Sequence, residues 1–449
     1  MSPWAGIAIV LAALAGAFAL LRLLQVVAAP HPEILRKLMH VFMGLVTAGF
    51  PWLFDDAWPV LLLASSSLLA LVLLRGDFAL TRPVQGVLHG VERSSWGELL
   101  FPLAVAIVFL LADGDPLLYC VPILVLTLAD AVAALIGVYY GQLRYTTLEG
   151  RKSVEGSLAF FIVTFLCVHV ALLLFSDVGR AESLLIGLLM GVIVMMFEAV
   201  AWRGLDNLFI PVGSFVLLES YLDASVPALV LRLVVILLLG LALLLSRHRN
   251  TLDDSTTLGA VLVAYGAWAV GGLYWLLVPA SVFILSTALA LRQKIDDQQQ
   301  IHTVYALLGV TAPGLVWLVL DRNQDSIALF FAYAMAWVAH HTMLAVSRAH
   351  YGRPRLAPVA LLPAILQGLV LLLLPFLLMW GFDERLPALA AFGAIVLGLC
   401  AFAFLKLQPQ LDKCPPDSKR WTRQGLIAVC ASMLAWGAVE MGWLGELRT

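Results

Sequence analysis

Long apolar segments recur along the whole chain and are separated by short polar breaks. The first runs from Trp4 to Ala29, and a helix needs about 20 mostly apolar residues to cross a bilayer. Hydrophobic residues make up 62% of the chain and charged residues only 12%, well below the roughly 25% of a soluble domain. The pattern excludes a water-soluble fold and predicts an all-α, polytopic integral membrane protein with roughly 14–16 transmembrane helices.

The polar breaks alternate between basic and acidic along the chain. Arg36–Lys37 and Arg151–Lys152 are examples of basic breaks, and Asp55–Asp56 and Asp383–Glu384 are acidic ones. Threading alternate breaks to alternate sides gathers most of the 27 Lys and Arg residues on one face, which the positive-inside rule makes cytoplasmic. Both termini are then expected to face outward. A net charge of −2 gives no reason to expect a nucleic-acid partner.

A basic break from Ser246 to Asn250 separates two parts of different character. Ionisable residues inside or beside the apolar segments are concentrated before residue 222, whereas later ones, such as His340 and His341, show no spacing that points to chemistry. We therefore expect a catalytic membrane domain over residues 1–246 and a C-terminal membrane domain of unknown role over residues 247–449.

Two short segments place charged residues at predicted cytoplasmic helix ends. In the first, Arg36 and Lys37 are followed one turn later by His40. These residues could belong to a functional site, or the two cations could simply anchor the helix end on the cytoplasmic side. In the second, Glu98 enters an apolar segment with no cation beside it in the sequence. Glu98 could belong to a functional site, or it could be an interfacial carboxylate that reaches water by snorkelling. The sequence leaves both interpretations open.

A third segment combines a membrane carboxylate with a polar helix start. Asp130 lies about two and a half turns inside an apolar helix, where a carboxylate needs a cation, a metal or a water path. Gly137 and Gly141 follow with the GxxxG spacing that favours close helix packing. The next helix begins with cations, hydroxyls and a carboxylate where backbone amides favour anions: Arg151, Lys152, Ser153, Glu155 and Ser157. This segment predicts a polyphosphate site, and the absence of GxxxxGK[ST] from the sequence excludes a P-loop.

The fourth segment contains Glu198 and, after a short break, Asp206 and Asn207. Carboxylate and amide oxygens at a helix mouth are ligands that Mg²⁺ accepts while phosphate oxygens fill its other positions. The alternative is an N-cap, because Asp and Asn are favoured there.

The four segments, in this order, resemble the membrane-embedded polyprenol kinases, which include dolichol kinases, phytol kinases and CTP-dependent diacylglycerol kinases. The motifs are R-K-x-x-H, D-x-x-A-x-x-x-G-x-x-x-G, K-S-x-E-G-S and an E followed by D-N-x-x-x-P, and they span residues 30–222. The resemblance implies transfer of the terminal phosphate of a nucleotide, usually CTP, to the hydroxyl of a lipid alcohol at the cytoplasmic leaflet. Ala131, Ser153 and Ser157 stand where relatives often carry Thr.

Phosphoryl transfer depends on positioning and charge neutralisation, so each motif residue receives an expected role. The expected catalytic residues are Asp130 or Glu155 as the base, with Lys152 at the phosphates. Residues expected to bind CTP, the phosphate donor, are Arg36, Lys37, His40, Arg151, Lys152, Ser153 and Ser157. Those expected to bind Mg²⁺ are Asp206, Asn207 and Glu198. The expected partners are a lipid alcohol, the nucleotide and membrane lipids.

Two rival functions remain open. A phosphatidate cytidylyltransferase would use CTP and a related lipid but release pyrophosphate, although its dense signature of paired cations, glycines and Asp-Arg is missing from the sequence. A lipid transporter or flippase would place ionisable and broken-helix elements near the membrane midplane in both halves. Here the ionisable residues gather at one face of one half.

Overall fold

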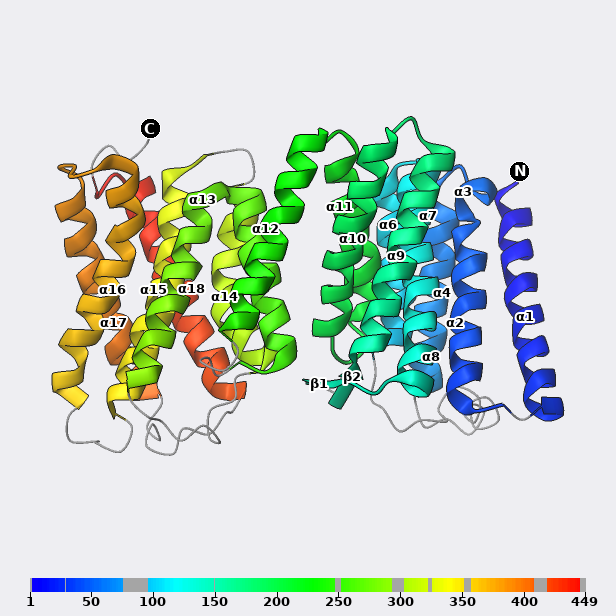
Figure 1. Ribbon diagram of the computed structural model, residues 1–449, viewed down its shortest axis with the longest axis horizontal. Coiled ribbons are helices and arrows are strands. Elements are labelled where there is room, and N and C mark those ends of the chain that lie inside the picture. Colours follow the sequence, from blue (N-terminus) through cyan, green and yellow to red (C-terminus); the bar gives the residue numbers. More distant parts are fainter. Residues whose placement is uncertain are drawn as a thin grey trace. The chain divides into compact units, whose positions relative to one another are not determined.

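The computed structural model describes residues 2–28, 30–75, 96–148, 150–246, 252–292, 303–321, 325–350, 357–407 and 418–444. The basic residues of the 76–95 and 247–250 segments, which entered the orientation and boundary predictions, lie outside these ranges. The described residues form helices joined by short turns, with one small β-hairpin (Figure 1). The all-α prediction is confirmed, with the hairpin as its one addition in the described part of the chain.

The chain divides into two compact units, residues 1–234 and 235–449. The division falls within a helix, before the basic break at which the sequence places a boundary. Unit 1 contains α1 (Pro3–Ala28), α2 (Pro32–Ala48), α3 (Phe50–Leu53), α4 (Ala57–Arg75), α6 (Gly97–Ala112), α7 (Pro116–Leu124), the π-helix η1 (Val125–Ala129), α8 (Asp130–Tyr140), β1 (Arg144–Thr147), β2 (Gly150–Ser153), α9 (Val154–Phe175), α10 (Arg180–Val200), α11 (Asp206–Leu222) and the start of α12 (Val226–Leu245).

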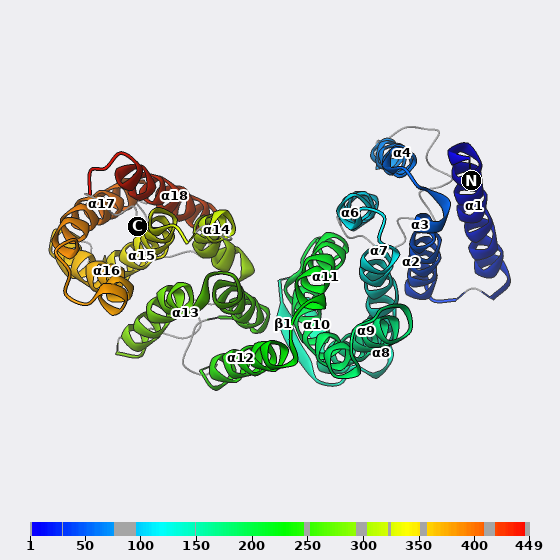
Figure 2. The same cartoon turned by 90° about the horizontal axis from the view of Figure 1, so that it is seen from above.

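Unit 2 is built around one buried helix. After α12 it contains α13 (Asp254–Arg292), α14 (Val304–Leu320), α15 (Ile327–His350), α16 (Ala357–Trp380), α17 (Leu386–Leu407) and α18 (Ser418–Glu440). Figure 2 shows α15 between these helices, and it packs against α13, α14, α16, α17 and α18. Consequently, 89% of the most apolar window of α15 is buried inside the protein.

Nine helices of the described residues are long and apolar enough to cross a membrane, which confirms a polytopic integral membrane protein. Three shorter apolar helices lie in α4, α6 and α14. The larger number expected from the sequence also includes α2, α11 and α18, which carry polar residues, and both halves of α13. Gly272 divides α13 because its φ of 81° and ψ of −166° are not helical.

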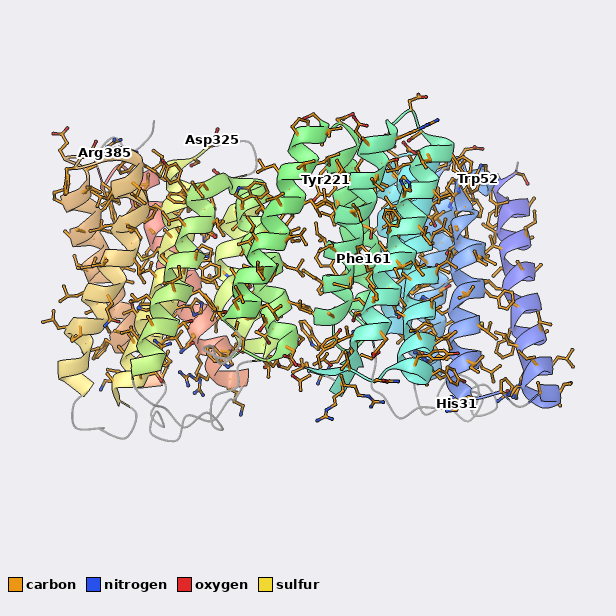
Figure 3. The ribbon with its side chains drawn as sticks, in the orientation of Figure 1. His31, Trp52, Phe161, Tyr221, Asp325 and Arg385 are labelled. Carbon is orange, nitrogen blue, oxygen red and sulfur yellow. The ribbon has the colours of Figure 1, made fainter. Side chains whose placement is uncertain are left out.

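One end of unit 1 collects the segments that the sequence singles out. His31, which caps α2, lies at this end together with the β1–β2 hairpin, whereas Trp52 and Tyr221 lie toward the other end (Figures 1 and 3). Helices α2, α9 and α11 begin here, and α8 and α10 finish here. The π-helix contacts α2, α9 and α11, so segments distant in the sequence meet around it.

Candidate functional site

A buried ion pair joins α2 to α8. The Lys37 Nζ lies 2.6 Å from Asp130 Oδ2, and the two side chains are only 5% and 15% exposed. His40 lies one turn further along α2, with its Nε2 3.6 Å from the same carboxylate oxygen. Asp130 therefore has the cation that a carboxylate inside an apolar helix requires.

The π-helix η1 immediately precedes Asp130 and shapes this contact. Its i→i+5 hydrogen bonding widens the turn, a feature often found at functional sites. The Leu126 carbonyl lies 3.3 Å from His40 Nε2, so η1 contacts the α2 histidine directly. A Cβ on Gly44 would overlap the Thr127 hydroxyl. The glycine thus lets α2 approach η1 closely and brings Lys37 and His40 to Asp130.

The β-hairpin presents the next cation. In the antiparallel register Lys152 pairs with Tyr145, and Arg151 pairs with Thr146. Successive strand residues point to opposite faces, so Arg151 is exposed while the Lys152 side chain turns toward α10. Ser153 ends the strand and caps α9, where its Oγ accepts a hydrogen bond from the Gly156 amide at 3.1 Å.

The predicted GxxxG contact holds the hairpin against the helices. A Cβ on Gly141 would lie 2.7 Å from the Ser153 Cβ, and one on Gly137 would lie 3.1 Å from the Ser153 Oγ. A Cβ on Gly156 would in turn lie 3.0 Å from the Ala133 carbonyl. The close packing expected from Gly137 and Gly141 is confirmed, and it fixes the start of α9 beside α8.

Lys152 forms a second ion pair, with Glu198 in the last turn of α10. Its Nζ lies 2.7 Å from Glu198 Oε1 and also donates to the Glu198 backbone carbonyl. Burial alone would lower the pKa of Lys152, but the charge and hydrogen bond of Glu198 outweigh burial and hold this pKa above its ordinary value. The Glu198 contact therefore favours the charged form of Lys152.

Asp206 connects the two ion pairs. It is the first residue of α11, after the N-cap Leu205, so the predicted N-cap alternative does not describe its position. Its Oδ1 accepts a hydrogen bond from the Asn207 amide at 3.1 Å. The carboxylate interacts electrostatically with both ion pairs, whose members are Asp130, Lys37, Lys152 and Glu198.

The turn before α11 is fixed by backbone conformation. Arg203 and Gly204 have φ angles of 52° and 83°, in the left-handed region. The Arg203 carbonyl accepts a 2.8 Å hydrogen bond from the Trp96 amide at the start of α6. This turn directs α11 back into the bundle beside η1. We call Lys37, His40, Asp130, Lys152, Glu198 and Asp206 the ionic cluster.

Three motif residues have their main contacts elsewhere. Glu155 accepts a 3.0 Å hydrogen bond from the Leu143 amide and so supports the hairpin. The Ser157 hydroxyl lies 2.8 Å from the Tyr145 hydroxyl. Arg36 is 55% exposed and paired with Glu33 at 2.6 Å, although its charge also acts on the two aspartates of the ionic cluster.

The donor set fits a Mg²⁺ ion that is shared with phosphates. Among the described residues no group of three or more His, Cys, Asp or Glu side chains is arranged to hold a metal alone. Asp130 and Asp206, however, are neighbouring carboxylates that repel each other, and Glu198 is held by Lys152. Mg²⁺ usually takes only one or two carboxylates and fills its remaining positions with phosphate and water.

Sequence reasoning missed three contributors to the site. The π-helix, Gly44 and Tyr145 all act through tertiary contacts. Only Gly44 carried a local signal, since it follows His40 by one turn on the face that bears Lys37.

Together these features define a polytopic helical membrane protein with a buried ionic site at the hairpin end of unit 1. No protein-family model matches the chain, and no solved structure matches it. The chain is similar to a phytol kinase from Synechocystis sp., with 29% identity over 186 residues that cover 40% of this chain and 76% of the relative. This similarity supports the relationship to the polyprenol and phytol kinases that the motifs predict.

Proposed function

We propose that unit 1 is a lipid-alcohol kinase that transfers the terminal phosphate of a nucleoside triphosphate, with CTP as the expected donor. The observation that carries the proposal is the ionic cluster itself, in which Asp206 interacts with the Lys37–Asp130 and Lys152–Glu198 pairs. The similarity to a protein named phytol kinase supports a lipid alcohol as acceptor. We propose a prenol such as phytol or dolichol, or diacylglycerol, as the substrate class.

In the proposed reaction the lipid hydroxyl oxygen forms a bond to the terminal phosphorus. The bond from that phosphorus to its bridging oxygen breaks, the nucleoside diphosphate leaves, and the hydroxyl proton passes to a carboxylate. We assign this carboxylate to Asp130, which the Lys37 ion pair holds in position. Glu155 is the weaker candidate because it hydrogen-bonds to the hairpin backbone.

The negative charge of the nucleotide phosphates would be neutralised by cationic side chains and by a bound Mg²⁺ ion. Lys152 would exchange part of its contact with Glu198 for a phosphate oxygen, and exposed Arg36 and Arg151 would bind the outer phosphates. Asp206 and Asn207, with Asp130 nearby, would hold Mg²⁺. When bound, Mg²⁺ neutralises the charge that develops on the phosphate oxygens.

We place the reaction on the cytoplasmic face. The hairpin end of unit 1 carries the basic residues Arg36, Arg144 and Arg151, and the positive-inside rule assigns such ends to the cytoplasm. Accessibility labelling of a cysteine introduced at Arg151 in intact cells and in inverted vesicles tests this side.

The deciding experiment uses the purified full chain, CTP or ATP labelled in the terminal phosphate, and a panel of phytol, dolichol and diacylglycerol. We expect label in one lipid, and no label with Lys152→Met. Release of pyrophosphate from CTP and phosphatidate would instead identify a cytidylyltransferase. No labelled lipid with any acceptor, under conditions where the protein stays folded, would refute the kinase.

A further inference from the structure

A second polar group lies inside unit 2, where the sequence assigns no chemistry. His341, on the central helix α15, is fully buried, and its Nδ1 lies 3.1 Å from the Ser286 hydroxyl of α13. Gln367 of α16 approaches the same ring. Arg348 follows two turns later on the same face of α15, and its charge acts on the ring. We call these four residues the α15 cluster.

The α15 cluster leaves three buried polar atoms without a hydrogen bond. They are His341 Nε2, Gln367 Oε1 and Arg348 Nη1, and none has a partner of normal geometry among the described residues. Buried polar groups are nearly always paired, and an unpaired one costs about 1–3 kcal/mol. The Gln367 amide oxygen lies near enough to the His341 ring for these two groups to affect each other, whereas Arg348 Nη1 keeps hydrogen-bonding capacity that a ligand with acceptor oxygens could use.

The charge of the α15 cluster identifies the class of that ligand. In the described part of the chain no carboxylate pairs with Arg348, and the charge acting on it is the like charge of Arg420 on α18. A buried cation requires an anionic partner. A guanidinium binds the oxygens of a phosphate group through several hydrogen bonds, and a hydroxyl and an imidazole can add further donors.

The position of the α15 cluster favours a lipid source. Arg348 lies in the last turn of α15, and His341 lies roughly two turns deeper. Gln367 and Ser286 are only partly buried, on two helices with many exposed apolar side chains. A phosphate could therefore sit at the level of the helix end while its apolar chain stays in the bilayer.

We propose that Arg348, His341, Gln367 and Ser286 bind the phosphate group of an amphiphile, specifically a lipid phosphomonoester. This inference goes beyond the proposed kinase site, which lies in unit 1, and does not depend on it. It gives unit 2 a role as a phospholipid-binding domain.

The test is ligand-induced thermal stabilisation of the purified full chain in detergent. The probes are dioctanoyl phosphatidate, uncharged dioctanoylglycerol and inorganic phosphate, since a ligand that binds only the folded state raises Tm with its concentration. We expect phosphatidate to raise Tm and dioctanoylglycerol to have a much smaller effect. Equal stabilisation by inorganic phosphate would support the phosphate site and assign its source to the free ion.

Four variants locate the binding. Arg348→Gln should weaken phosphatidate binding about tenfold or more, the scale of one charge-assisted contact. Gln367→Leu removes only a neutral acceptor for the P–OH of a singly protonated phosphate and should weaken binding less. Lys406→Gln changes an exposed cation at the end of α17 and should leave binding unchanged. Lys152→Met weakens any binding of phosphatidate as a product at the unit 1 site, so the stabilisation that remains in this variant, and that is lost when Arg348→Gln is added to it, reports the α15 cluster.

The proposal is overturned if Arg348→Gln binds phosphatidate like the wild type, or if Lys152→Met abolishes binding instead. Misfolding does not hide the answer, because unliganded Arg348→Gln removes an unpaired buried charge and should keep at least the wild-type Tm. A large drop of that Tm would show a structural ion pair and would equally overturn the proposal.

Discussion

The Asp206 carboxylate at the start of α11 interacts electrostatically with the Lys152 ammonium at the end of the hairpin. Neither residue is near the other in the sequence, and each belongs to a different motif. Lys152 is also paired with Glu198, so the cation has two acidic neighbours. An incoming phosphate would compete with these neighbours for Lys152, and a divalent cation would reduce the acidic charge.

Asp206→Asn tests the proposed metal site. The substitution keeps the size and hydrogen bonding of the side chain but removes the charge on which a hard cation depends. We expect activity to fall roughly 100-fold, the scale of losing one electrostatic contact to a transition state, with an unchanged Tm and partial rescue at high Mg²⁺.

Kinase assays across a magnesium titration measure this effect. The control is Asp223→Asn at the opposite end of α11, which should behave like the wild type. Wild-type turnover of Asp206→Asn at limiting Mg²⁺ would remove Asp206 from the metal site.

Glu198→Gln tests how Lys152 keeps its charge. In the wild type the pKa of Lys152 is raised by Glu198 against the opposing effect of burial. The stability from this pair is thus fully present below the ordinary lysine pKa and is lost only as pH rises through the raised value. Without the Glu198 charge, burial should lower the pKa of Lys152, and activity should decline at a lower alkaline pH than in the wild type.

The measurement is the pH profile of kcat/KM from about pH 6 to about pH 10. Glu182→Gln at the other end of α10 is the matched control. An alkaline limb that does not move in Glu198→Gln would show that Lys152 is not the group that titrates.

Asp130→Asn separates a structural role from a catalytic one. The change leaves Lys37 buried without its counterion, which should cost about 3 kcal/mol of unfolding free energy and abolish activity. The double variant Lys37→Met/Asp130→Leu removes both charges and should recover most of the stability. Chemical or thermal unfolding measures the first effect, and a kinase assay measures the second.

If the double variant regained activity together with stability, Asp130 would be only a structural partner of Lys37. An inactive, stable double variant is the expected result.

Gly44→Ala tests the close approach of α2 to the π-helix. The added Cβ would overlap the Thr127 side chain, and overpacking of this kind costs about 1–3 kcal/mol. We expect a lower Tm and a loss of activity, because Lys37 and His40 move away from Asp130. Gly16→Ala on α1 is the control, since its Cβ would meet no atom within 4 Å.

Unchanged stability and turnover in Gly44→Ala would mean that α2 can shift at no cost. The close approach would then have no part in forming the ionic cluster.

Part of the site could be predicted because its chemistry is local. The cost of a carboxylate inside an apolar helix predicts a cation, a metal or a water path for Asp130, of which the structure shows the cation Lys37. GxxxG spacing predicts the tight packing at Gly137 and Gly141. The membrane class follows from composition alone. These rules need only the residues of one helix or the composition of the chain.

The remainder depends on contacts between distant segments. The pairing of Lys152 with Glu198 joins residues that are 46 positions apart, and no spacing rule connects them. The β1–β2 hairpin carries no clear signal in the sequence, and its alternation sends Arg151 and Lys152 to opposite faces. Glu33 stands three residues before Arg36 in the sequence, which is a spacing that allows an ion pair on a helix. The sequence does not show that Arg36 uses this local partner instead of contacting the ionic cluster directly.

The π-helix before Asp130 also sets the angular phase of the helix that carries it. One additional residue per turn rotates everything that follows by about 100° relative to an uninterrupted α-helix. The rotation therefore contributes to the direction in which Asp130 and Gly137 of α8 face, toward α2 and the start of α9 respectively. Deleting a single residue from η1 would rotate the carboxylate and the glycines together by that angle. The π-helix therefore determines whether Asp130 points toward Lys37.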